Sequence, residues 1–359
     1  MLPMMTEVYG NASSIHHFGQ VARQRLDAAR KQVATMLGAE SQEVVFTSGG
    51  TEADNLAIFG VTSGTAAHVV TTTFEHPAVL AAAAQLGHTL VPVDGRGMID
   101  PDAVRSALRP NTKVISVMHA NNEVGTIQPI AEIARIAAEA GVPLHSDGVQ
   151  AVGKIPVSVA GLEVTLYSIS GHKIGAPKGV GALYVRKGIS IKPMMFGGRH
   201  ERERRAGTEN VAGAVALARA AEWIAEHGEA ENSRQGTLRD RLEQSVLDRI
   251  ADTRVNGAPV PGVPRVPNTT NIRFDGIDSD ALLIALDLKG FAVSSGAACS
   301  SGAPEPSHVL LAMGLSRLEA RSSIRFSLGR SNTIEQVDAL VEALVDSVAH
   351  LRKLAPAYV

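Results

Sequence analysis

Val44-Val45-Phe46-Thr47-Ser48-Gly49-Gly50-Thr51-Glu52 is the stretch that decides the fold. Its first four residues favour a strand, two glycines then permit a tight turn, and helically spaced apolar residues follow. A strand, a glycine turn and a helix in this order are typical of a sheet on which helices pack. Such a turn also presents backbone N–H groups, the Thr51 hydroxyl and the positive end of a helix, which together favour an anion.

Strands and helices alternate on both sides of this turn. Apolar positions at helical spacing indicate a helix over 18–37, and Asp100-Pro101 indicates the start of another. The expected strands are 68–72, 113–119, 143–146, 164–168 and 181–185, and Ala-rich helices such as 130–140 separate them. This alternation predicts an α/β fold with a mostly parallel sheet covered by helices on both faces.

The pattern changes beyond an alanine-rich helix that is expected to follow Thr208 and to end near Gly228. Beyond it we expect strands at 268–274 and 322–327 and helices at 279–288, 307–312 and 333–354. We therefore predict a large domain over 1–229 and a smaller α+β domain over 230–359. The N-terminal segment could also pack with the smaller domain.

Bulk composition excludes several classes of protein. Hydrophobic residues make up 45% of the 359 residues, which is ample for a buried core and argues against disorder. The 34 Lys and Arg and the 36 Asp and Glu residues give a net charge of −2, so nucleic-acid binding is not expected as the main task. Because the chain has neither a long apolar run nor a signal-peptide start, we expect no membrane segment and a cytoplasmic protein.

Lys173 and Asp147 are the strongest candidates for chemistry. Lys173 stands on a turn just past the strand expected at 164–168, and Asp147 ends the preceding strand. Adjacent parallel strands would bring both residues to one edge of the sheet, where ligands bind in this class of fold. A lysine that forms a Schiff base and a carboxylate that keeps a pyridine nitrogen protonated match the needs of pyridoxal 5'-phosphate (PLP). The alternatives are a solvated surface lysine and a helix-capping aspartate.

A phosphate group would need a site of its own beside these residues. Ser170 and His172 precede Lys173, and together with the turn at 48–51 they suit one phosphate. His76 follows a strand, and its imidazole could stack on a flat cofactor or move protons. Most of the 12 histidines must nevertheless be structural. No paired His or Cys spacing predicts a metal site.

Cys299 is the single cysteine of the chain and lies in the run Ser-Ser-Gly-Ala-Ala-Cys-Ser-Ser, residues 294–301. It therefore has no partner for an internal disulfide or a thiolate metal cluster. A solitary cysteine is most often a small buried residue, but the neighbours of Cys299 are too small and polar to bury it. We therefore predict a nucleophilic thiol on a loop.

Eight segments together resemble the cysteine desulfurases, a group of PLP enzymes related to the class V aminotransferases. The segments occur in the family's order from near Gly10 almost to the C-terminus: 47–55, 75–76, 121–125, 147–150, 170–179, 205–210, 294–301 and 325–329. The residues around Cys299 resemble the group with the longer catalytic loop. The resemblance implies the type I fold of PLP-dependent transferases, in which a seven-stranded mixed sheet is joined to a smaller α+β domain.

The resemblance also implies how PLP would be held. Lys173 would carry it as a Schiff base, Asp147 would pair with the pyridine nitrogen, His76 would stack on the ring, and Gln150 would bond the phenolic oxygen. The residues implied for the phosphate are Gly50, Thr51, Ser170 and His172, with Thr208 reaching it from the partner subunit of a homodimer.

Substrate roles follow from the same resemblance. Asn122 and Arg325 would grip the substrate carboxylate, and the Cys299 thiol would attack the sulfur of L-cysteine and become a persulfide while L-alanine is released. The implied protein is an L-cysteine desulfurase, a sulfurtransferase that passes sulfur to an iron–sulfur scaffold or another acceptor protein. The alternatives are a selenocysteine lyase or an aminotransferase on the same scaffold, or a truncated paralogue that binds PLP without turnover.

Two departures from the family pattern bear on these expectations. Family members usually carry a strand and an Asn-x-Ala-Thr-Thr segment ahead of a Gly-Asn-Pro motif, whereas this chain starts almost at that motif and has Ala12 in place of the proline. Gly148 stands where an alanine commonly packs against the ring. We expect the missing methyl group to loosen the cofactor slightly.

Overall fold

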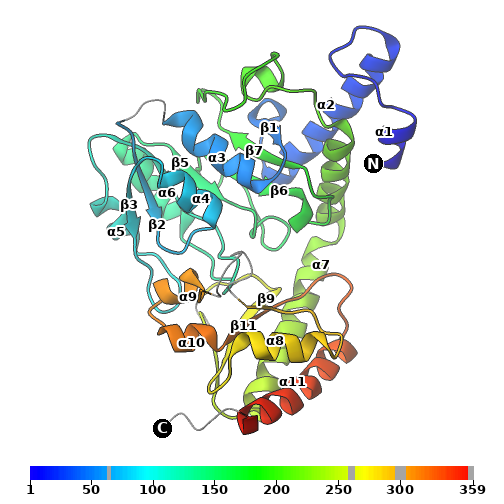
Figure 1. Cartoon of the computed structure of the whole chain (residues 1–359). Coiled ribbons are helices and arrows are strands. Elements are labelled where there is room, and N and C mark those ends of the chain that lie inside the picture. Colours follow the sequence, from blue (N-terminus) through cyan, green and yellow to red (C-terminus); the bar gives the residue numbers. More distant parts are fainter. Residues whose placement is uncertain (63–65, 258–262, 296–304, 355–359) are drawn as a thin grey trace. The chain divides into compact units, whose positions relative to one another are not determined.

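Two β-sheets organise the chain in the computed structural model, which describes residues 1–62, 66–257, 263–295 and 305–354 (Figure 1). The larger sheet consists of β1 (Val44–Thr47), β2 (His68–Thr72), β3 (Gly87–Val91), β4 (Thr112–Ser116), β5 (Leu144–Asp147), β6 (Leu166–Ser170) and β7 (Gly181–Val185). The helices that accompany it are α1 (Leu2–Thr6), α2 (His17–Leu37), α3 (Gly50–Val61), α4 (Pro77–Ala83), α5 (Pro101–Ser106) and α6 (Ile130–Ala140). Short 3₁₀ helices lie at η1 (Ser41–Glu43), η2 (Gly171–Lys173) and η3 (Glu201–Glu203).

The seven-stranded sheet is mixed, with the strand order β1-β7-β6-β5-β4-β2-β3. The strands from β3 to β6 in this order are parallel to their neighbours, whereas β7 is antiparallel to both β6 and β1. The predicted α/β fold with a mostly parallel seven-stranded sheet is therefore confirmed. Because parallel strands end at the same edge, the residues that follow β5 and β6 come together there.

Helix α3, which follows the glycine turn, packs on this sheet. Its Ala53 and Leu56 are buried against Val45, Leu166 and Leu183, which come from three different strands. The helix contacts β1, β4, β5, β6 and β7. This packing fixes the start of α3, and with it the glycine turn, at the sheet.

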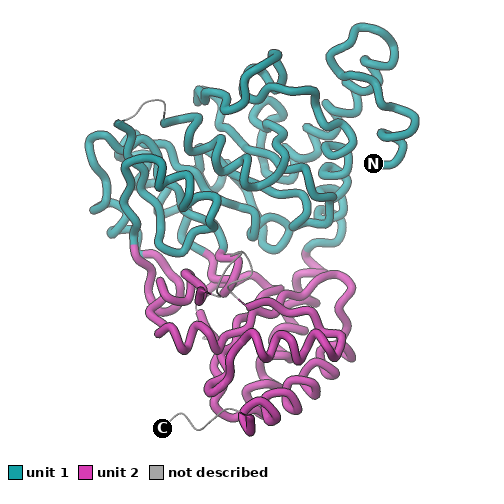
Figure 2. The backbone as a smooth tube through the Cα atoms, in the orientation of Figure 1, with its two compact units in different colours: residues 1–91, 100–120, 128–228 teal, residues 92–99, 121–127, 229–359 magenta. Residues whose placement is uncertain are grey.

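The chain divides into two compact units, shown in Figure 2. Unit 1 comprises residues 1–91, 100–120 and 128–228, and unit 2 comprises 92–99, 121–127 and 229–359. The structure therefore differs from the continuous domains that the sequence predicts, because two connections of the large sheet belong to unit 2. Backbone hydrogen bonds explain one of them: Ile127 N donates to Pro264 O, and Val266 N donates to Gly125 O, both at 2.9 Å. The N-terminal segment belongs to unit 1.

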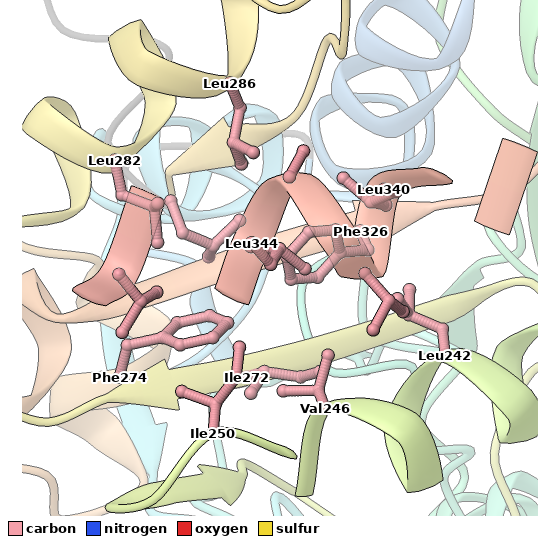
Figure 3. Packing of buried hydrophobic residues seen from close by; sticks show 14 of the residues in the cluster. Leu242, Val246, Ile250, Ile272, Phe274, Leu282, Leu286, Phe326, Leu340 and Leu344 are labelled. Atoms are coloured by element: carbon pink, nitrogen blue, oxygen red, sulfur yellow. The ribbon is translucent and has the colours of Figure 1, made fainter. Parts of the chain in front are cut away.

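Unit 2 is built on a four-stranded antiparallel sheet with the order β10-β11-β9-β8. Its strands are β8 (Thr253–Val255), β9 (Thr269–Phe274), β10 (Ser294–Ser295) and β11 (Ser323–Ser327), and its helices include α8 (Ser279–Asp287), α9 (His308–Ala312), α10 (Arg317–Arg321) and α11 (Ile334–Leu354). Figure 3 shows its core, in which Phe274 and Phe326 from the sheet meet Leu282 from α8 and Leu344 from α11. This core gives unit 2 its own hydrophobic interior.

Helix α7 (Val211–Arg249) is a single helix of 39 residues that runs from unit 1 into unit 2. The sequence predicts that it ends near Gly228, since glycine costs about 1 kcal/mol relative to alanine in a helix. This prediction is wrong, because Leu238, Leu242 and Val246 continue the helix into the core of unit 2. Burying each such side chain contributes about 1.5–3 kcal/mol, which outweighs the glycine. No helix within the described ranges combines the length and apolar character that crossing a lipid bilayer requires.

The remaining differences concern strand positions. The strand expected over 113–119 ends at Ser116, and β3 (Gly87–Val91) is not predicted at all. Of the five residues of β3, Val91 alone is buried, since the strand lies at the edge of the sheet. An edge strand with a polar, partly exposed sequence lacks the apolar alternation that would reveal it.

Candidate active site

Asp147 and Lys173 lie at the same edge of the large sheet. Asp147 is the last residue of β5, and Lys173 is the last residue of η2, which follows β6 directly. Since β5 and β6 are parallel neighbours with Asp147 opposite Ser168, the segments that follow them are adjacent. The positive charge of Lys173 lowers the pKa of Asp147, so the amine and the acid act on one another.

Asp147 is one of three buried carboxyl groups near this edge, with Asp54 of α3 and Glu75 after β2. Burial raises the pKa of Asp147 to about 6, while a hydrogen bond from Val149 N (2.9 Å) and the charge of Lys173 oppose the rise. Burial raises the pKa of Glu75 to about 8, and burial together with the charge of Asp147 raises the pKa of Asp54 well above its usual range. At pH 7 Asp147 is therefore mostly ionised, whereas Glu75 is mostly protonated.

A buried polar network that the sequence does not predict lies beside Asp54. His145 Nε2 is 2.8 Å from Ser168 Oγ and 3.6 Å from Asp54 Oδ1, and its Nδ1 is 2.8 Å from Ser116 Oγ. Burial lowers the pKa of His145 to about 3, so the ring is neutral. Its only signal in the sequence is the presence of polar residues in a strand that is otherwise expected to be apolar.

The predicted phosphate residues gather at the start of α3 and the end of β6. Ser170 Oγ lies 3.0 Å from His172 Nδ1, which links the two side chains. Burial and the charges of Lys173 and Lys178 lower the pKa of His172, so the surroundings are electropositive. Thr51 stands in the first turn of α3, where backbone N–H groups and the helix dipole favour an anion.

Gly50 is required where this turn meets the rest of the site. A Cβ at Gly50 would stand 2.8 Å from Cγ2 of Val149 and 3.4 Å from Cβ of Ser170. The absence of a side chain lets the backbone of the turn approach both the segment after Asp147 and the end of β6. The glycine turn therefore packs against the segments at the ends of both β5 and β6.

His76 and Gln150 are oriented by local hydrogen bonds. His76 caps α4, because its Nδ1 accepts a hydrogen bond from Ala78 N at 3.1 Å, which leaves the proton of the neutral ring on Nε2. The Oε1 atom of Gln150 accepts a hydrogen bond from Lys154 Nζ. Since an ammonium can only donate, the amide nitrogen of Gln150 is the atom that faces elsewhere as a donor.

Thr208 lies near the glycine turn of its own chain. It lines a cavity of about 220 Å³ with Ser48 and Gly179. The segment that carries it is held by an ion pair between Arg205 Nε and Glu52 Oε1 (2.9 Å). A hydrogen bond from Asn210 Nδ2 to the backbone oxygen of Gly179 (3.2 Å) holds its other end.

Asn122 and Arg325 lie together in unit 2. Arg325, in β11, donates a hydrogen bond from Nη1 to the backbone oxygen of Asn122 at 3.2 Å. Its Nε atom is buried and has no hydrogen-bond partner among the residues that the structure describes. A guanidinium with a buried donor to spare suits a carboxylate ligand. The two residues meet because the connection 121–127 belongs to unit 2.

The predicted nucleophile, Cys299, lies outside the described residues. The described part of its motif ends with β10, in which Ser294 pairs with Arg325 and Ser295 with Ile324. The chain therefore approaches this motif from a strand that lies beside the candidate substrate residue Arg325.

Comparison with known proteins assigns the family. The class V aminotransferase family matches residues 1–340. A cysteine desulfurase of Gluconacetobacter diazotrophicus is 47% identical over 365 residues, covering 99% of this chain and 90% of the relative. The chain belongs to the cysteine desulfurases of the class V aminotransferase family.

Solved structures agree with this membership of the cysteine desulfurases. A NifS-like protein superposes with a TM-score of 0.90 at 35% identity, covering 98% of this chain and 94% of its own. The protein SspA, solved in complex with cysteine, superposes with a TM-score of 0.79 at 32% identity, covering 91% of this chain and 92% of its own. The resemblance read from the sequence motifs is thus confirmed over nearly the whole chain.

Membership of the cysteine desulfurases implies PLP as the cofactor. The residues of unit 1 fit this group. The buried carboxylate of Asp147 is ionised at pH 7, Lys173 lies near enough to act on it, and the close-packed Gly50 turn offers donors for a phosphate. These three features are what the ring nitrogen, the aldehyde and the phosphate of PLP each need.

Proposed function

We propose that this chain is an L-cysteine desulfurase that releases L-alanine and transfers the sulfur to Cys299 as a persulfide. In this reaction the C–S bond of cysteine breaks and an S–S bond to Cys299 forms. The proton of the Cys299 thiol balances the equation, since cysteine and a thiol yield alanine and a persulfide. The interaction of Asp147 with Lys173 at one edge of the sheet is the observation that carries the proposal.

The residues of unit 1 would hold PLP and control its protons. The chemistry that PLP supplies when bound is a sink for the electrons of a broken C–H bond. Lys173 Nζ would attach it as a Schiff base, and the ionised Asp147 would hold a proton on the pyridine nitrogen. His76 would stack on the ring, and the amide nitrogen of Gln150 would donate to the phenolic oxygen. The proposed phosphate donors are Gly50, Thr51, Ser170 and His172, with Thr208 supplied by the partner subunit of a homodimer.

The proposed substrate contacts belong to unit 2. The buried Nε of Arg325 and its neighbour Asn122 would bind the carboxylate of L-cysteine. A cysteine thiol has an unperturbed pKa of about 8.5, so only a few per cent of it is ionised at neutral pH. The Cys299 thiol would therefore need a basic group nearby to take its proton before it attacks sulfur.

The setting that we propose is a cytoplasmic sulfur-transfer pathway. The persulfide on Cys299 would pass to an iron–sulfur scaffold or another acceptor protein. Selenocysteine lyase and aminotransferase activities would use the same cofactor residues as a cysteine desulfurase. The three activities are therefore distinguished by what happens to the sulfur of the substrate, and not by the fold.

Addition of L-cysteine to the purified protein tests the proposal. We expect an absorbance band of bound PLP that changes on addition of L-cysteine, together with equal amounts of alanine and persulfide sulfur. Amino-group transfer would instead leave the cofactor as pyridoxamine phosphate. A band that does not respond to L-cysteine would support a PLP-binding protein without turnover and would contradict the proposal.

Replacing Arg325 with glutamine is expected to raise KM for L-cysteine by about 10- to 100-fold, because a hydrogen bond to a charged group is worth about 1.5–3 kcal/mol. PLP absorbance should not change, since Arg325 is not among the proposed cofactor residues. Arg321→Gln is a matched control, because Arg321 is exposed and pairs with Asp278 on the surface of the same unit. An unchanged KM in the Arg325 variant would remove Arg325 from the substrate site.

A further inference from the structure

Tyr167 occupies the space that a side chain at position 148 would need. A Cβ at Gly148 would stand 2.0 Å from Cε1, 2.1 Å from Cζ and 2.5 Å from the hydroxyl oxygen of Tyr167. These distances are far below van der Waals contact, and the obstacle is the fully buried ring of the second residue of β6. The lack of a side chain at Gly148 therefore leaves room for the Tyr167 ring. We call these two residues a matched pair, because a larger residue at 148 would need a smaller one at 167.

The hydroxyl group of Tyr167 is held by a second buried residue. It lies 2.7 Å from His119 Nδ1, and the two rings meet edge to face with their centroids 5.9 Å apart. Burial lowers the pKa of His119 to about 4 and raises the pKa of Tyr167 well above its usual range. Both groups are thus neutral at pH 7, and the contact is one buried hydrogen bond between neutral groups.

His119 also holds the backbone of Asp147. The backbone N–H of His119 donates to the Asp147 backbone oxygen at 2.8 Å, and the backbone N–H of Gly148 donates to the Ser168 backbone oxygen at 3.0 Å. One residue therefore fixes both the peptide of Asp147 and the ring that lies against Gly148. The Tyr167 ring thus lies against the residue that follows Asp147, and His119 holds both this ring and the Asp147 carbonyl.

We propose that Tyr167 is a positioning residue for Asp147, acting with His119 to fix the end of β5 from behind Gly148. The inference rests on the proposed function, in which Asp147 binds the pyridine nitrogen of PLP. The space of the missing methyl group at Gly148 is filled by the Tyr167 ring, which bears on the expectation that this glycine loosens the cofactor slightly. Tyr167 does not touch the reacting atoms in this proposal.

Tyr167→Phe tests the proposal because it keeps the ring and removes only the hydroxyl. We expect the dissociation constant of PLP, measured by equilibrium dialysis, to rise about three- to tenfold. We also expect the pH midpoint of the absorbance change of bound PLP to rise by about half a unit or more. An Asp147 that is held less firmly would keep a proton on the pyridine nitrogen of PLP less effectively. The Schiff-base nitrogen of Lys173 would then retain its own proton to higher pH, because two protonated nitrogens on one ring system repel each other.

Tyr184→Phe is the matched control. Tyr184 is buried on β7 directly opposite Tyr167, and its hydroxyl bonds Arg186 instead of His119. Loss of either hydroxyl should lower the melting temperature, but only Tyr167→Phe should move the PLP affinity and the pH midpoint. If the two variants lower the melting temperature alike and leave both PLP measurements unchanged, the positioning role is overturned.

A double-mutant cycle provides the second test. Gly148→Ala alone should weaken PLP binding by more than about tenfold, because its methyl group must displace the Tyr167 ring. Combined with Tyr167→Leu, it should bind PLP better than Gly148→Ala alone, since the smaller side chain makes room. Additive losses would contradict the matched pair. Should Gly148→Ala not fold, the comparison of the two phenylalanine variants still decides.

The two proposals fail in different ways. If the unmodified protein binds no PLP, the proposed function and the role of Tyr167 fall together. If it binds PLP and converts L-cysteine while Tyr167→Phe matches the control, only the role of Tyr167 is lost.

Discussion

Replacing Cys299 with serine is expected to abolish persulfide formation and to reduce alanine release from L-cysteine by at least about a hundredfold. A hydroxyl group is far less acidic than a thiol and cannot take sulfur as a persulfide. The absorbance of bound PLP should be unchanged, because the residues proposed to hold the cofactor lie elsewhere in the sequence. The measurements are alanine by chromatography, persulfide by mass spectrometry of the peptide that carries Cys299, and the visible spectrum.

Ser300→Ala is the control for this experiment, since it alters the neighbouring residue and keeps the thiol. It should retain persulfide formation. Full sulfide release by the Cys299→Ser variant would contradict the desulfurase proposal. Alanine release from selenocysteine that survives in the serine variant, while release from cysteine is lost, would favour a selenocysteine lyase.

Replacing Lys173 with arginine is expected to reduce activity by at least about a thousandfold. Arginine keeps a positive charge beside Asp147, so the charge that lowers the pKa of that carboxyl group is retained. It cannot form a Schiff base, because its guanidinium stays protonated. Borohydride reduction followed by peptide mass spectrometry should find PLP attached to Lys173 in the unmodified protein and to no lysine in the variant.

Lys187→Arg is the matched control, because Lys187 is exposed and follows β7. It should leave both the attachment and the activity unchanged. Attachment of PLP to another lysine in the unmodified protein would contradict the proposed role of Lys173. Substantial activity in Lys173→Arg would show that the positive charge alone suffices.

Much of unit 1 could be predicted from the sequence because its strands are short apolar runs bounded by turn residues. The β1 strand, its glycine turn and α3 follow directly from residues 44–52, and the central strands lie within a few residues of their expected positions. The edge strand β3 could not be predicted, because four of its five residues are exposed or half-buried and do not form an apolar pattern. The length of α7 could not be predicted either, because the core of unit 2 stabilises it beyond Gly228.

Some features of the candidate site could likewise be predicted from the sequence, and others could not. Asp147 and Lys173 could be placed together because each follows a predicted parallel strand, and strand ends meet at one edge. The pairing of Tyr167 with Gly148 depends on which residues of β5 and β6 are adjacent, which a single sequence does not specify. Arg325 and Asn122 meet only because a short connection of the large sheet belongs to unit 2, and no local pattern marks that connection.

The interleaving of the two units bears on how the protein is made. The chain passes between them at 91/92, 99/100, 120/121, 127/128 and 228/229. A ribosome that has released residues 1–228 has therefore released two pieces of unit 2 without their partners. Glu123, whose buried carboxylate accepts a hydrogen bond from Ser307 Oγ at 2.5 Å, lacks this partner until residue 307 has emerged. Unit 2 thus completes its fold only after residues that follow α7 have been made, and a nascent chain stalled in α7 would expose these two connections to chaperones and proteases.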